Sequence, residues 1–457
     1  MHLDEPRRAR VRPWIRKLAL FVLPVLVVIL GMRVWDYIEA QRLSREIESI
    51  RAKGEPVNGN ALIDPQYGLA DNAEYKYAAA ATLATAPAIY SVIGGAELGG
   101  GTAMQAYARF ASIRQWVAGA SSAPSLDGFQ AVTIALTSEW QEAYSLVDKA
   151  AASPYRGILP GGEYSYRVAG LWNLLRLLSA RTIGLAVAGD ADGAANSAIS
   201  AIKLRRAIRP SQRSFLTTHE VPAMLSLSKP SEGALSRLQK TLADEEDADG
   251  PTRDFIAARA QMLDILWRQA YGRTQGVDTS GAMVMRGPFP WELLPSPVMR
   301  PLYTHRFVNT MRAWSELSDI ARKPWPERAA LAAGPMARYR EGWTLKGPPS
   351  GPATAVMWFE QALQPEALIH DRCSRIAVAI ERYRRANGES LPAALTNLVP
   401  RYLTDIPEDP LTGKALLFRA GPDAYLVYSV GRNGKDDGGR LRVQPDPDTG
   451  IRVLIRK

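Results

Sequence analysis

The longest apolar stretch of the chain lies near its start. Residues 18–32, LALFVLPVLVVILGM, carry no charge, and Trp14 and Trp35 flank them. A helix that spans a membrane needs about 20 residues. The stretch reaches that length over 14–36 if the basic residues within these limits extend their charged ends to the headgroups. The pattern therefore predicts a transmembrane anchor over 14–36.

The residues before this anchor are basic. Residues 1–13 include Arg7, Arg8, Arg10 and Arg12, and positively charged flanks stay on the cytoplasmic side of a membrane. No small-x-small cleavage site follows the apolar stretch, so it differs from a removable signal peptide. We therefore expect a single-pass protein of the bacterial inner membrane, with a cytoplasmic basic tail over 1–13 and the bulk of the chain in the periplasm.

Residues 37–345 repeat apolar positions at helical spacing and predict a helical periplasmic domain. The clearest part is 166–208, where two helical patterns flank the turn sequence AGDADG at 188–193. This helical hairpin resembles one tetratricopeptide-like unit. No clean repeat of about 34 residues follows it, so a repeat array is not indicated. Antiparallel packing of helices is the expectation.

Other segments of this domain differ in pattern. An alanine-rich helix is predicted from about Asn72, another helix from Ser231, and a third over 304–321. Residues 281–301 are rich in proline and aromatic residues and predict an irregular segment. The sequence KGPPSGP opens a predicted linker at 346–360.

Residues 361–457 change to a mixed pattern. Apolar residues from Ile369 to Tyr383 recur at spacings of three and four and predict one amphipathic helix, ended by Asn387 and Gly388. KALLFRA and AYLVYSVG, separated by Gly-Pro-Asp, predict a β-hairpin. IRVLIRK and RLRVQ are expected to form a second short hairpin. The expected fold is mainly α, with a transmembrane helix, a helical central domain and a small α+β module that has antiparallel strands.

A glycine-rich loop with two adjacent aspartates follows the second strand. In YSVGRNGKDDGG, residues 428–439, Asp436 and Asp437 stand side by side. Adjacent carboxylates repel each other unless a cation or solvent screens them. Calcium binds about six to eight oxygens from carboxylates, amides and carbonyls, and glycine lets a backbone wrap closely. A calcium site and an exposed turn are both consistent with this composition, and the spacing is not that of an EF-hand.

The C-terminal module resembles a known family. The order of ERYRRANGESLP, LTNLVPRYLTDIPEDPLTGKAL and AYLVYSVGRNGKDDGG is similar to the C-terminal domain of the major pseudopilin, type II secretion system protein G. The resemblance covers residues 364–440. It implies a bound Ca²⁺, with side chains of Asn433, Asp436 and Asp437 and a carbonyl near Val430 as ligands.

Composition narrows the classes of function. The net charge is +10, but no internal Lys/Arg stripe alternates with aromatic residues, so we expect no nucleic-acid binding. The single cysteine, Cys373, excludes an intrachain disulfide and a cysteine-based zinc site. The four histidines do not stand at the spacings of a metal motif.

A search for catalytic residues finds one weak cluster. Ser214 to Glu220, SFLTTHE, places a His-Glu pair near hydroxyl groups. The same residues are typical of a helix start, with Thr217 or Thr218 as cap. No catalytic residue is assigned, and we do not expect an enzyme. An envelope hydrolase is the alternative, and it requires a deep pocket with His219 or His305 beside a carboxylate.

The expected function is that of a membrane-anchored envelope protein acting in protein interaction or secretion-related assembly. Its expected partners are the inner membrane and envelope or secretion proteins. A divergent pseudopilus subunit is a further alternative, although the apolar run KLALFVLPV lacks the glutamate-containing processing motif of pseudopilins. Such a subunit would also need one continuous helix from the membrane to the module.

Overall fold

The structure is a computed structural model. It describes residues 13–58, 73–84, 138–153, 164–207, 220–246, 296–325, 365–441 and 448–455, with short pieces between 110 and 133, 252 and 263, and 327 and 334. The mainly helical character predicted from the sequence is confirmed, as is a small antiparallel sheet at the C-terminal end.

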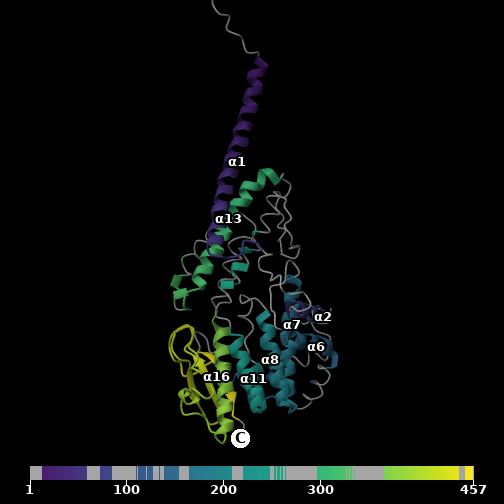
Figure 1. The fold of residues 1–457 in the computed structure, drawn as a ribbon, viewed down its shortest axis with the longest axis vertical. Helices are drawn as coiled ribbons and strands as arrows, with labels where there is room; N and C mark the ends of the chain where they lie inside the picture. The colour runs from purple at the N-terminus through teal and green to yellow at the C-terminus, as the bar shows by residue number, and fades with distance from the viewer. Residues whose placement is uncertain are drawn as a thin grey trace, which may run out of the picture.

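Helix α1, Pro13–Ala52, is one helix of 40 residues. It joins the apolar segment and the charged segment that follows it without a break. The chain then turns at Gly54, which has a φ of +71°, a conformation that glycine adopts at no steric cost. Figure 1 shows the N-terminal half of α1 standing out from the rest of the molecule.

The predicted anchor over 14–36 lies partly outside the described side chains, which begin in α1 at Val22. Within the part of the chain that is described, no helix is long and apolar enough to qualify as a membrane span.

Helix α13, Ser296–Ala321, packs along the C-terminal half of α1 (Figure 1). It begins eight residues before the predicted start at 304, so the prediction of an irregular segment over 281–301 is wrong for 296–301. Pro297 lies in the first turn of α13, which tolerates proline because its N–H groups have no intrahelical acceptor, whereas Pro301 lies inside the helix. Packing against α1 then stabilises a helix that local composition does not favour.

The predicted hairpin of helices is confirmed. Helix α7, Tyr164–Val187, and helix α8, Ala191–Ala207, pack against each other. Gly189 turns the chain between them with a φ of +88°. This body also contains α2 (Ala73–Ala84), α6 (Gln141–Ala151), α10 (Glu220–Leu227) and α11 (Glu232–Asp244).

The C-terminal module contains one long helix and three strands. Helix α16, Glu366–Ala386, packs on a sheet of order β1-β2-β3 (Leu417–Ala420, Ala424–Ser429 and Thr449–Leu454), and a 3₁₀ turn, η4, covers Leu395–Leu398. The hairpin of β1 and β2 is confirmed. All six residues of β3 pair with β2. The expected hairpin of RLRVQ with IRVLIRK lies largely outside the described residues, because 442–447 are not described.

The module and the helical body share one hydrophobic core. A single cluster of buried side chains runs from α2 through α7, α8 and α11 to α16 and the sheet. Polar contacts join the two parts as well: the Leu454 N–H donates to the Ser226 hydroxyl at 3.0 Å, and the Arg452 guanidinium donates to the Val117 carbonyl at 3.2 Å. The predicted linker at 346–360 lies outside the described residues.

Candidate functional site

The acidic loop connects the end of β2 to the start of β3. Glycines at 431, 434, 438 and 439 all have positive φ, so the loop uses backbone conformations that side chains disfavour. At Gly439 a Cβ would also lie 3.0 Å from the Leu426 side chain. The glycine content predicted to let this loop wrap tightly is therefore required by its conformation.

The structure brings two of the predicted ligands together. The Asn433 amide nitrogen donates to Asp437 Oδ2 at 2.9 Å, while Asn433 Oδ1 accepts from the Lys435 N–H at 2.9 Å. Asp436 turns toward the sheet, where its Oδ1 accepts from the Tyr428 hydroxyl at 3.1 Å and the Gly438 N–H at 2.8 Å. Both aspartates are exposed, and Val430 follows β2 directly and is half-buried.

Asp448 is a third carboxylate at this loop, and the sequence analysis missed it. It is 2% exposed, and its two oxygens accept from the Gly439 N–H at 2.8 Å and the Asp437 N–H at 3.3 Å. Burial raises the pKa of Asp448, and the charges of Asp437 and Asp436 raise it further, although the two N–H groups act in the opposite direction. Asp448 holds the backbone of the loop in place.

The phenol of Tyr428 is a fixed donor in this site. Burial, followed by the hydrogen bond to Asp436, raises the pKa of Tyr428 to about 12. The hydroxyl therefore stays protonated at neutral pH and orients the Asp436 carboxylate.

The carboxylate of Asp409 stabilises the start of the loop. It is 2% exposed, and its carboxylate accepts from the Ser429 hydroxyl at 2.8 Å and the Leu411 N–H at 2.9 Å. The Ser429 hydroxyl in turn accepts from the Gly431 N–H at 3.2 Å. The Pro-x-Asp-Pro segment and the first turn of the loop are thus joined through one buried carboxylate.

The oxygen-bearing side chains of this loop are suited to bind calcium, but they already form hydrogen bonds with other groups of the module. One carboxylate oxygen each of Asp436 and Asp437 already accepts a hydrogen bond. No group of three Asp, Glu, His or Cys side chains converges in a metal-binding arrangement within the described ranges. A cation bound by Asn433, Asp436 and Asp437 would therefore replace some of these donors.

The histidine required by the hydrolase alternative lies between α1 and α13. His305 Nδ1 is 2.9 Å from Glu39 Oε1, and its Nε2 is 3.1 Å from the Asn309 amide nitrogen. The carboxylate neighbour is thus present, but both ring nitrogens have partners, and the side chain is 38% exposed. His219, the other candidate, lies outside the described residues.

Buried charges also meet where α8, α10 and α16 join. The Arg205 guanidinium donates to Asp371 at 2.6 Å. Burial raises the pKa of Glu220, although the positive charges of Arg205 and Arg114 oppose this. As predicted, Glu220 lies in the first turn of a helix. The cluster links three elements and is best explained as structural.

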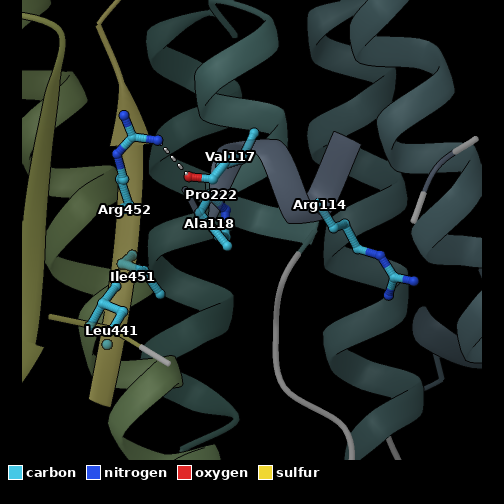
Figure 2. Close-up of a pocket in the computed structure, with 8 residues that line it drawn as sticks. Arg114, Val117, Ala118, Pro222, Leu441, Ile451 and Arg452 are labelled. Atoms are coloured by element: carbon cyan, nitrogen blue, oxygen red, sulfur yellow. Dashed lines mark hydrogen bonds between the residues drawn. The ribbon is translucent and has the colours of Figure 1, made fainter. Parts of the chain in front are cut away.

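A small cavity lies between β3 and the helical body. Figure 2 shows Arg452 reaching from β3 toward Val117, while Arg114 points away from it. Pro222, Leu441 and Ile451 complete much of the lining, and the volume is about 30 Å³. Such a space has room for a water molecule and not for an organic substrate.

Comparison with known proteins found no matching family model, no matching curated protein and no matching solved structure.

Proposed function

We propose that this protein is a membrane-anchored envelope protein that acts by protein interaction and not by catalysis. The exposed half of α1 is the observation that carries the proposal. Between positions 22 and 38 it exposes many large apolar side chains: Val22, Leu23, Val25, Leu26, Val27, Val28, Ile29, Leu30, Val34, Tyr37 and Ile38. A patch of this kind in water is unfavourable and marks a surface that another phase or molecule covers.

A bilayer fits the dimensions and the charge pattern of this half of α1. A helix over 14–36 is roughly 35 Å long at 1.5 Å per residue, and the hydrocarbon core is about 30 Å thick. Trp14 and Trp35 stand near its two ends, where aromatic residues favour the membrane interface. The C-terminal half of α1 instead packs on α13.

Alkaline carbonate extraction of cell membranes tests the anchor. The full-length protein should remain in the membrane pellet, and a Val25→Arg/Val28→Arg variant should move partly to the soluble fraction, because charges at mid-membrane are costly. Arg45→Gln, an exposed change on the C-terminal half of the same helix, is the matched control and should stay in the pellet. Complete extraction of the wild-type protein would reject the anchor.

We also propose that the loop between β2 and β3 binds Ca²⁺ through Asn433, Asp436, Asp437 and the carbonyl of Val430. The proposal is supported by three oxygen-bearing side chains within five residues of a glycine-rich loop and by the similarity to the major pseudopilin. The buried carboxylates of Asp448 and Asp409 hold the loop backbone in a defined shape. A bound cation would lower the repulsion between the neighbouring carboxylates.

Thermal unfolding of the full-length protein in detergent tests calcium binding. Calcium at 100 times its dissociation constant should add about 2.7 kcal/mol to the free energy of unfolding, and Asp437→Ala should abolish this effect. Asp405→Ala, at an exposed aspartate elsewhere in the module, should retain it. An unchanged melting temperature with calcium in the wild-type protein, together with no heat of binding, would reject the site.

Partners of this protein are proposed to be envelope or secretion proteins, as the similarity of the module to a pseudopilin suggests. We favour binding over hydrolysis because both nitrogens of His305 are engaged by Glu39 and Asn309.

A further inference from the structure

Helices α1 and α13 run parallel and are joined by a regular series of ionic contacts. Glu39 pairs with His305, Glu46 with Arg312, and Lys53 with Asp319, and each pair is separated by 266 residues in the sequence. Positions seven apart on one helix thus meet positions seven apart on the other, as in a parallel coiled coil. We call this row of contacts, together with Asp36–Arg300, the α1–α13 seam.

Buried apolar residues lie behind the seam. Leu43 of α1 packs with Val308 and Met311 of α13, and Leu263 completes the cluster. The apolar packing and the pairs of the seam together determine beside which part of α1 helix α13 begins. Figure 1 shows that α13 begins near the middle of α1, below its protruding half.

The first pair of the seam stands where the exposed apolar half of α1 ends. Arg300 donates through Nε to Asp36 Oδ1 at 2.8 Å. The last of the large exposed apolar side chains on α1 are Tyr37, which is 66% exposed, and Ile38. Arg300 is in the second turn of α13. The start of α13 is therefore level with the proposed edge of the bilayer.

The charged side chains at this level have ionic or hydrogen-bonding partners. Asp36 pairs with Arg300, and Glu39 accepts from His305 and, at 3.2 Å, from the indole N–H of Trp35. The Glu39 side chain is only 3% exposed. Paired and hydrogen-bonded charges are the form in which ionised groups tolerate a medium of low dielectric constant.

The sequence at the start of α13 suits the same environment. Residues 296–302, SPVMRPL, contain three large apolar residues and a single charge, that of Arg300, which Asp36 neutralises. Interfacial segments of membrane proteins combine apolar residues with polar groups that reach the headgroups.

We propose that the N-terminal end of α13, residues 296–302, lies in the lipid headgroup layer of the bilayer that α1 crosses. The protein then meets the membrane at two places, one spanning and one interfacial, and the α1–α13 seam holds them together. This inference rests on the proposed membrane anchor. The ligand class is the headgroup and upper acyl layer of a phospholipid bilayer.

Fluorescence of single NBD labels tests the proposal in the full-length protein. Cys373, which is fully buried, is replaced by Ser, and cysteine is introduced at Leu302, at Leu26 in α1, or at the exposed Lys323 beyond the end of α13. The proteins are reconstituted into vesicles of phosphatidylethanolamine and phosphatidylglycerol, with and without nitroxide-labelled lipid. Val298→Cys is a second probe of the same helix end in case Leu302→Cys disturbs folding, and circular dichroism checks each variant.

Labels at 302 and 298 should show blue-shifted emission and quenching by a nitroxide at headgroup depth. The label at 26 should be quenched by a nitroxide deep in the acyl chains, and the label at 323 by neither. If 26 is quenched while 302 and 298 behave like 323, the contact of α13 is refuted and the anchor stands. If the label at 26 is not quenched either, the anchor itself fails and the inference fails with it.

Discussion

At the residue scale, Arg384 organises the interior of the C-terminal module. It is 3% exposed and donates to Glu381 at 2.8 Å and to Glu389 at 3.1 Å. The Tyr425 hydroxyl donates to the same Glu381 at 2.8 Å. Burial raises the pKa of Glu381, and the charge of Arg384 and the hydrogen bonds partly oppose it.

Arg384→Met is expected to destabilise the protein by about 3–5 kcal/mol, because Glu381 would keep a buried charge without its cation. Arg440→Met, at an exposed arginine of the same module, should change stability by less than about 0.5 kcal/mol. Urea denaturation measures both. Equal midpoints for the two variants would contradict this role of Arg384.

Gly170 permits the close approach of α7 to α2. A Cβ at this position would lie 2.3 Å from the Ala81 carbonyl oxygen, so Gly170→Ala must separate the two helices. A loss of about 1–3 kcal/mol is expected from overpacking. Gly233→Ala is the matched control in a helix, because the nearest atom to a Cβ there is the flexible end of Arg237, at 3.7 Å. Calorimetry of both variants measures the loss of stability.

The sequence could predict some site residues and not others. Asp436 and Asp437 are recognisable because two carboxylates stand together among glycines. Asp448 and Asp409 stand in the proline-containing sequences PDPDTG and PEDP, and no local pattern indicates that both are 2% exposed. Their burial results from the pairing of β3 with β2 and the packing of α16, which bring together residues far apart in the chain.

At the element scale, the α1–α13 seam is expected to respond to acid. Burial would raise the pKa of Glu39, but the hydrogen bond and charge of His305 hold it below its ordinary value of 4.5. Glu55 lies just beyond the end of α1 and is not one of the seam pairs. Burial raises its pKa, but hydrogen bonds and charges from Arg259 and Arg322 outweigh burial and lower it. A carboxyl group with a lowered pKa stabilises the fold above its ordinary pKa, and this stability is lost as the pH falls through the lowered value.

The melting temperature should therefore fall as the pH decreases below about 4.5. Glu39→Gln/Glu55→Gln should have a lower melting temperature at pH 7 and a weaker dependence on pH in the acid range. Glu142→Gln, at an exposed glutamate of α6, should follow the wild-type curve. Parallel acid curves for the wild-type and the double variant would refute the assignment.

Elements with strong local signals were predicted well. The α7–α8 hairpin, α16 and the β1–β2 hairpin each combine an apolar pattern with turn residues. The start of α13 was not predicted, because prolines at 297 and 301 suggest an irregular segment, whereas the contacts that stabilise this helix come from α1. The similarity of the module to a pseudopilin and the metal site stay predictions.

At the scale of the whole molecule, the module is built into the helical body. Ile376 of α16 is fully buried in the core cluster that also contains Leu238 of α11 and Ile202 of α8. Ile376→Ala should cost about 2–5 kcal/mol and lower hydrogen-exchange protection in α8 and α16 together. Loss of protection in α16 alone would show that the module unfolds independently. Leu126→Ala, at an exposed leucine, is the control.

The continuity of helix α1 affects how its two halves can move. This single helix of 40 residues is roughly 60 Å long, and its C-terminal part packs against α13. A piston-like or rotary displacement of the upper part would reach α13 through the contacts between the two helices. The protruding part of α1 and helix α13 are therefore expected to move as one unit.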